Sequence, residues 1–326
     1  TSTERTAGTP QGDPEVSSGA GWKEVGRTTL GSAGDTIDIS SLPDKRYYMV
    51  LTSDIADGTI DARFRLGNGS VDTGSNYARR GSENGAADGT GTGNDSLLIP
   101  YAENGNTHFF GVHYFANKSD EEKLLVGNCV DEYASGAGNA PARFENAGKW
   151  SNTSDVIDVI RNYNAQSGSY ASGSEMVVLG YDPADAHTDN FWQELASVEL
   201  SGAGDEISSG TFTAKKYLWI QAYIKGDGSS TSNLRVQVNG DTGSNYAERQ
   251  SANGASDGTG TSQDHFPAGN GGKFGNLVNM FVINNASKEK LFIVHGNSVD
   301  TSGAGTAPAR REIVGKWANT SNQITS

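Results

Sequence analysis

The chain has 326 residues and a formal net charge of −14, and apolar residues make up 34% of it. This length can bury a sizeable core, but no window approaches the roughly 18 consecutive apolar residues of a membrane-spanning helix. The acidic excess and the lack of a basic run argue against nucleic acid as a partner, because phosphates are met by clustered Lys and Arg. The single cysteine, Cys129, excludes an intrachain disulfide and a cysteine zinc site, and its apolar neighbours predict a buried, unreactive thiol.

In chain order, residues 1–20 are polar, contain Pro10 and Pro14, and are expected to form a flexible N-terminal arm. Residues 21–180 then carry runs of β-branched and aromatic residues separated by Gly, Asn, Asp and Ser clusters, the pattern of short strands and turns. The predicted strands are Thr36–Ile39, Arg46–Thr52, Asp61–Leu66, Thr107–Phe115, Lys123–Val130 and Val156–Tyr163. No segment has helical periodicity, and the Gly-rich stretch 81–94 is expected to be an exposed loop.

The second half of the chain repeats the first. The heptapeptide Asp72–Ala78 recurs letter for letter as Asp241–Ala247, and the similarity extends over both units. Further matches are Trp22 with Trp192, Gly34–Asp35 with Gly204–Asp205, and Gly148–Trp150 with Gly315–Trp317. The polar segment 181–190 is the predicted linker, and 191–326 form the second unit. We therefore expect an all-β protein of two tandem antiparallel β-sandwich, jelly-roll-like domains.

The two units differ at their ends. After Trp150 the first unit continues to Glu175–Leu179, which predicts further strands, whereas nine residues follow Trp317. The second unit is therefore expected to lack its last strands. Because an unfilled sheet edge exposes backbone donors and acceptors, we expect either that a neighbouring subunit fills it or that the chain is trimmed.

The repeated Asp-Thr-Gly triplet also occurs in pepsin-like aspartic proteases, once in each of two β halves. A catalytic pair would consist here of Asp72 and Asp241, which would share a proton to activate water. In those enzymes the triplet follows a buried apolar strand, whereas here Asn68–Val71 and Val238–Gly240 lead into it, and these are turn sequences. The surroundings favour two turns over an active site, and no catalytic residue is predicted.

Asp72, Asn76, Asp241 and Asn245 are also candidate ligands of a calcium ion, because hard cations take oxygens from Asp, Asn and loop carbonyls. The alternative is that each Asp–Asn pair stabilises a turn without a metal. No complete ligand set is visible in the sequence, so no cofactor is predicted and calcium stays open as a candidate.

The remaining candidates for chemistry are histidines and aromatic residues. His108 and His113 lie five apart on a predicted strand, so their side chains are expected to point to opposite faces and not to share a metal. Sugar-stacking aromatics are open as an alternative to core packing. The other histidines are His187, His265 and His295, and the aromatic candidates are Tyr47, Tyr48, Tyr101, Tyr114, Trp150, Trp219 and Trp317.

The segment Val238–Tyr246 (VNGDTGSNY) resembles a family of virion structural proteins from tailed viruses of bacteria and archaea. Their units pair an apolar strand that ends in an Asn-Gly-Asp-like turn with a later Gly-Ser-Glu-apolar strand, which is Gly173–Leu179 in the first unit here. The resemblance covers both units, although the second lacks this later element. It implies that the loop positions Asp72, Asn76, Tyr77, Asp241, Asn245 and Tyr246 define the fold.

The resemblance implies a non-enzymatic virion component, in the capsid decoration, turret, tail or fibre, that forms a homo-oligomer. The expected partners are further copies of the chain, other virion proteins and a host-surface glycan or receptor, with no nucleic acid and no membrane insertion. Two other classes remain open, an extracellular carbohydrate-binding module and, with less support, a pepsin-like aspartic protease.

Overall fold

The computed structural model describes residues 21–326 except 103–106, 184, 186–188, 230–233 and 270, and it does not describe the side chains of 100–102. The predicted arm, His187 and the Tyr101 side chain lie outside this part. All regular elements in the described residues are strands, which pair antiparallel, so the predicted all-β sandwich is confirmed. No helix of the described chain is long and apolar enough to cross a membrane.

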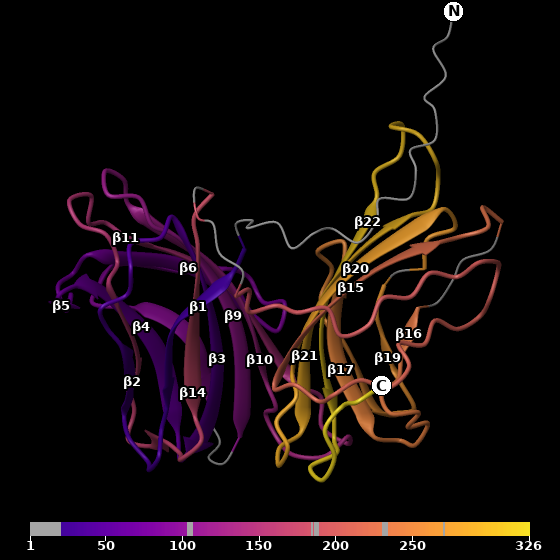
Figure 1. Cartoon of the computed structure of the whole chain (residues 1–326), viewed down its shortest axis with the longest axis horizontal. Helices are drawn as coiled ribbons and strands as arrows, with labels where there is room; N and C mark the ends of the chain where they lie inside the picture. Colours follow the sequence, from indigo (N-terminus) through magenta and orange to yellow (C-terminus); the bar gives the residue numbers. More distant parts are fainter. Residues whose placement is uncertain (1–20, 103–106, 184, 186–188, 230–233, 270) are drawn as a thin grey trace, which may run out of the picture.

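The first half contains two sheets that face each other (Figure 1). The larger sheet has the order β1 (Lys23–Thr29), β14 (Glu175–Tyr181), β3 (Tyr47–Asp57), β9 (His108–Ala116), β10 (Lys123–Asp131), β11 (Ala142–Trp150), β6 (Tyr77–Glu83) and β7 (Gly89–Asn94), with β13 (Ser169–Tyr170) on β3. The smaller sheet has the order β2 (Thr36–Ile39), β12 (Val159–Asn164), β4 (Ile60–Asn68) and β5 (Ser70–Val71), with β8 (Leu97–Ala102) on β4.

Alternating side chains of these two sheets make the core of the first half. Phe64 and Leu66 of β4 are fully buried, whereas Arg63 and Arg65, which alternate with them, lie on the other face, as the predicted alternation requires. Cys129 is part of this core, and its burial raises the pKa of the thiol well above its ordinary value, which agrees with the predicted unreactive thiol.

The second half keeps one full sheet and a fragment of the other. Its main sheet has the order β15 (Tyr217–Lys225), β20 (Gly275–Ile283), β21 (Lys290–Val299), β22 (Ala309–Trp317), β17 (Tyr246–Ala252) and β18 (Gly258–Gln263). Among the described residues of this half, the strands that face it are the pair β16 (Arg235–Val236) and β19 (Phe266–Pro267). The described strands of this half include no counterparts of β1, β2, β12 or β14.

The two main sheets pack against each other through an apolar layer. Phe110 and Val112 of the first half meet Phe281 and Ile293 of the second, and β10 lies beside β21 (Figure 1). Every described strand pair lies within one half, so side chains and loops join the halves instead of a shared sheet.

All six predicted strands are present, with ends shifted by a few residues. The exposure expected for 81–94 is confirmed, but the expected loop is wrong, because β6 and β7 form a hairpin there, and β17 and β18 form its counterpart within 246–263. These Gly- and Thr-rich strands form because the hairpin pairs with β11 or β22 of the main sheet, which local composition does not indicate.

Candidate functional site

The two Asp-Thr-Gly triplets fold into matching turns. The Asp72 carboxylate accepts hydrogen bonds from the Gly74 backbone N–H (2.8 Å) and from the Asn76 amide (2.8 Å). Asp241 accepts the same bonds from Gly243 (2.8 Å) and Asn245 (2.9 Å). An aspartate that binds the N–H group two residues on closes an Asx turn.

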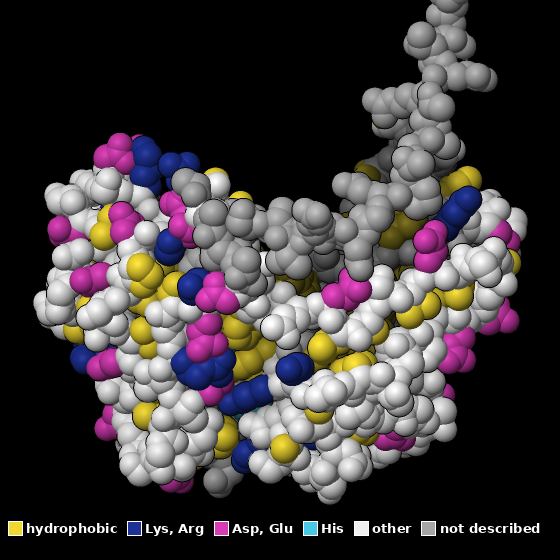
Figure 2. All heavy atoms as spheres, viewed as in Figure 1, with side chains coloured by type: hydrophobic (Ala, Val, Ile, Leu, Met, Phe, Trp, Pro, Cys, Tyr) yellow, Lys and Arg dark blue, Asp and Glu magenta, His cyan; other side chains and the backbone are white. Residues whose placement is uncertain are grey.

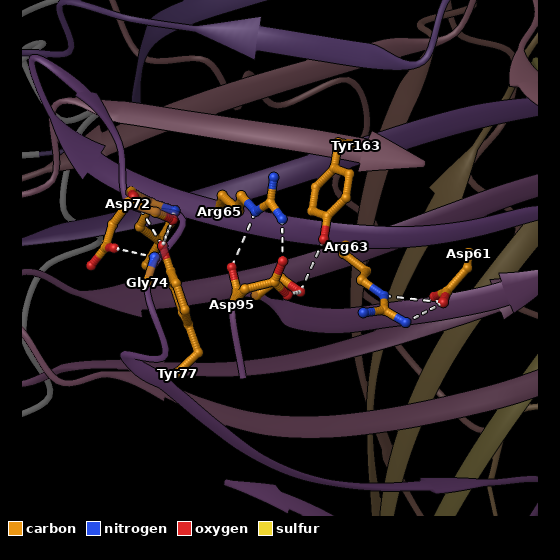
Figure 3. A network of polar contacts seen from close by, with 10 residues as sticks. Asp61, Arg63, Arg65, Asp72, Gly74, Tyr77, Asp95 and Tyr163 are labelled. Atoms are coloured by element: carbon orange, nitrogen blue, oxygen red, sulfur yellow. Dashed lines mark hydrogen bonds and ion pairs between the residues drawn. The ribbon is translucent and has the colours of Figure 1, made fainter. Parts of the chain in front are cut away.

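A tryptophan and a tyrosine fix each turn to the sheet. In the first half the Trp150 indole donates to the Asp72 carboxylate over 2.8 Å, and the Tyr77 hydroxyl donates to the Asp72 carbonyl over 3.0 Å (the Asp72–Tyr77 contact is seen in Figure 3). The second half repeats both contacts with Trp317 (2.7 Å) and Tyr246 (3.0 Å) on Asp241. All four aromatic side chains are buried. The motif is thus one recurring structural unit made of a turn, a tryptophan and a tyrosine.

The electrostatics of the two aspartates differ from those of a protease pair. Partial burial raises the pKa of Asp72, but hydrogen bonds from Trp150, Asn76 and Gly74 outweigh this effect and lower the pKa below its ordinary value. The pKa of Asp241 is lowered in the same way. Two carboxylates that share a proton would have one strongly raised pKa. The described contacts instead bind each aspartate to N–H donors of its own half.

The same donors bear on the calcium candidates. Each Asp carboxylate already accepts hydrogen bonds from three N–H groups, of a glycine, a tryptophan and its Asn neighbour, whose amide NH₂ points toward it. N–H dipoles aimed at the carboxylate oxygens repel a cation, which favours the turn over an ion at this position. Among the described residues, no group of three or more His, Cys, Asp and Glu side chains is placed to hold a metal.

Two buried polar clusters in the first half were not predicted from the sequence. Ser53 Oγ lies 3.0 Å from His108 Nε2, but both side chains are fully buried, and this burial lowers the pKa of His108 to about 3. A substrate cannot reach this pair in the folded state. His113 is equally buried and packs edge-on against Phe64 in the core.

The second cluster is a chain of hydrogen bonds between the two sheets. The Tyr170 hydroxyl donates to Asn162 over 2.8 Å, and the Asn162 amide donates to Asp54 over 2.9 Å. Burial raises the pKa of Asp54 to about 7 against the opposing hydrogen bond from Asn162. Because all three side chains are sealed in the core, the cluster fixes the packing of the sheets.

Charged side chains also line the outer face of the smaller sheet (Figure 3). Arg63 binds Asp61, with 3.0 Å from Nε to the carboxylate, and Arg65 binds Asp95 and lies 4.1 Å from the ring centre of Tyr163. Opposite charges pair along this face, so it is a neutralised surface and not a single-sign binding patch.

The junction between the halves contains a buried lysine. The Lys316 side chain is fully buried, and its ammonium lies 3.4 Å from the Glu289 carboxylate and donates to the backbone carbonyls of Glu132 and Ala134 in the first half. Glu289 in turn accepts a hydrogen bond from the Gly136 N–H over 2.6 Å. Burial lowers the pKa of Lys316 although the nearby carboxylates oppose this. The lysine and the glutamate together tie the second half to the loop after β10.

Two further ionic contacts cross the junction. Arg143 of the first half and Asp257 of the second are 2.7 Å apart and almost fully buried. Glu175 binds Lys216 (3.0 Å) and accepts a hydrogen bond from the Tyr217 hydroxyl (2.7 Å). Although burial raises the pKa of Glu175, these donors and Thr29 lower it to about 2. Such desolvated pairs fix one relative orientation of the halves, because any other would leave a buried charge unpaired.

A cleft of about 680 Å³ opens at this junction. The end of β3 at 55–57 and the loop at 171–173 of the first half form one wall, and 284–288 of the second half form the other, with Lys216 and Lys288 in the lining. Basic side chains gather over the junction in Figure 2. None of the described lining residues is aromatic.

The aromatic candidates for sugar stacking lie elsewhere. Tyr48, Trp150 and Trp317 are buried in the cores, and Trp219 stacks on Phe281 inside the junction at a ring distance of 5.3 Å. These side chains are used for packing.

No protein-family model matches the chain, and no curated protein matches it either.

Proposed function

We propose that this protein is a non-enzymatic structural component of a virion that assembles into a closed homo-oligomer. The observation that carries the proposal is the contact set of the repeated motif. The residues that the two halves share letter for letter build the same turn, with the same tryptophan and tyrosine on it, in both halves. What the duplication preserves is therefore a scaffold, as a repeated building block of an assembly requires.

Two features of the chain support this proposal. Several buried charged groups join one half to the other, which makes a rigid body of fixed orientation, suitable for packing around a symmetry axis. The likeness of VNGDTGSNY to virion structural proteins supplies the setting, a particle of a tailed virus. Further copies and other virion proteins are the proposed partners, and a host-surface glycan or receptor is the proposed outer contact.

The test is the native mass of the full chain, measured by light scattering and native mass spectrometry at low and high salt, with and without calcium. A discrete oligomer supports the proposal. A monomer under all four conditions contradicts it. Cleavage of a protein substrate at acid pH that is lost in Asp72→Asn would replace the proposal with the protease alternative.

A further inference from the structure

The main sheet of the second half has an unpaired edge at β15. On one side β15 pairs with β20, so that Tyr217 lies opposite Ile283. In the first half β3 makes the matching pair with β9, with Tyr47 opposite Ala116, and its other edge is covered by β14. The described residues place no strand on that second edge of β15.

The missing neighbour leaves apolar side chains exposed. The pairing register matches Ile220 of β15 with Val50 of β3, yet Ile220 is 40% exposed and Val50 is 0% exposed. Tyr223 is 69% exposed, and its partner on β20, Leu277, is 52% exposed. An apolar strand edge of this kind is a template for pairing with another chain.

The segment that corresponds to the strand beyond β14 is also unpaired. Residues 193–199 correspond in sequence to β1, which in the first half pairs with β14. Here the segment forms no strand, and the exposed apolar side chains of this region are Leu195, Val198, Leu200 and Ile207. A strand added on β15 would take the place that β14 has in the first half, where β14 pairs with β3 on one side and with β1 on the other.

The other described edges of the main sheets are protected against pairing. The edge strands β7 and β18 are short and rich in Gly and Thr, and β1 carries Lys23, Glu24 and Arg27. β15 is nine residues long and has no charge before Lys225. Short length and charged side chains are means by which proteins block edge pairing, and β15 has only the terminal Lys225.

We propose that β15 pairs antiparallel with β15 of a second copy of this chain, around a twofold axis, to form one continuous sheet across both copies. The strand is complementary to itself, because antiparallel self-pairing places uncharged residues opposite each other and puts the two Lys225 side chains at opposite ends. The exposed apolar rows on both faces, Ile220 on one and Tyr223 on the other, are covered together. This inference rests on the proposed function and names one interface of the assembly.

The experiment compares the full-length protein with Ile220→Lys, Tyr223→Lys and the control Val126→Lys by sedimentation equilibrium. Val126 is 54% exposed on β10 of the first half, so the control adds the same charge at a similar exposure away from β15. The wild type and the control are expected to associate equally, and both β15 variants to bind a second copy at least tenfold more weakly. Circular dichroism confirms folding, and Tyr223→Lys decides the outcome if Ile220→Lys misfolds.

A cross-link tests the pairing itself. Gln221→Cys places a thiol on an exposed residue near the middle of β15, whereas the natural Cys129 is buried. Oxidation is expected to give a disulfide-linked dimer of Gln221→Cys and not of the wild type. An oligomer that neither lysine variant weakens, or that gives no cross-link, overturns β15 pairing and leaves the assembly proposal standing. A monomeric wild type counts against both.

Discussion

β3 and β15 occupy matching places in the two halves, but they differ in how much of each is buried. From Tyr48 to Ala56 every residue of β3 is buried, whereas β15 is buried only at Tyr217 and Leu218. The difference lies in the neighbours. β3 pairs with β14 on the side away from β9 and faces a full second sheet, whereas β15 pairs with β20 alone among the described strands. The segment at 193–199 shows the same effect, because it resembles β1 and forms no strand without a partner. Strand formation here depends on the available partner as much as on local propensity.

The largest expected effect tests a second contrast between the halves, at matching lysines. Lys316 and Lys149 lie opposite Leu291 and Leu124 in the same register, but Lys316 is fully buried beside Glu289 and Lys149 is 44% exposed. Lys316→Met leaves the buried Glu289 carboxylate without its ammonium partner, so we expect the free energy of unfolding to fall by about 3 kcal/mol.

The matched control is Lys149→Met, which breaks only the exposed ion pair with Glu122 and should cost less than about 0.5 kcal/mol. Urea unfolding of both variants measures the difference. Equal effects would show that the buried lysine does not join the halves.

The sequence allowed prediction of much of the fold and of less of the site. The strands β3, β9 and β10 were predicted because runs of β-branched, aromatic and other apolar residues lie between Gly, Asn, Asp and Ser clusters, and the Asp-Thr-Gly turns because turn chemistry is local. The indole partner of Asp72 is 78 residues away and could not be inferred. Gly148–Trp150 and Gly315–Trp317 have the same letters, yet only the second lysine is buried, because the environment is set by the opposite half.

An intermediate effect is expected at the two turns. In Asp72→Asn and Asp241→Asn an amide NH₂ can replace the carboxylate oxygen that faces the tryptophan N–H, so one charge-assisted hydrogen bond is lost. We expect each variant to lower the free energy of unfolding by about 1.5 to 2 kcal/mol. Asp88→Asn, which affects only an exposed ion pair with Arg80, is the control and should have almost no effect. A loss confined to one turn would contradict their equivalence.

The smallest effect concerns pH and a third matched pair. Met280 of β20 occupies the place that His113 has on β9. Burial lowers the pKa of His113 from 6.5 to about 3, so below pH 6.5 the unfolded chain binds a proton that the folded protein does not. This histidine therefore has no effect on stability above pH 6.5 and lowers it increasingly from pH 6.5 to about 3.

His113→Met introduces the methionine that the second half has at this position and removes the imidazole that binds the proton in the unfolded chain. His108 keeps its own contribution in both proteins. We expect the variant to lose stability less steeply on acidification, with a difference of about 1.4 kcal/mol between pH 7.5 and 5.5. Thermal and urea unfolding across this range measure it. Parallel pH profiles would mean that His113 takes up its proton in the folded state, and the first half would then tolerate a charge at a position where the second half has a thioether.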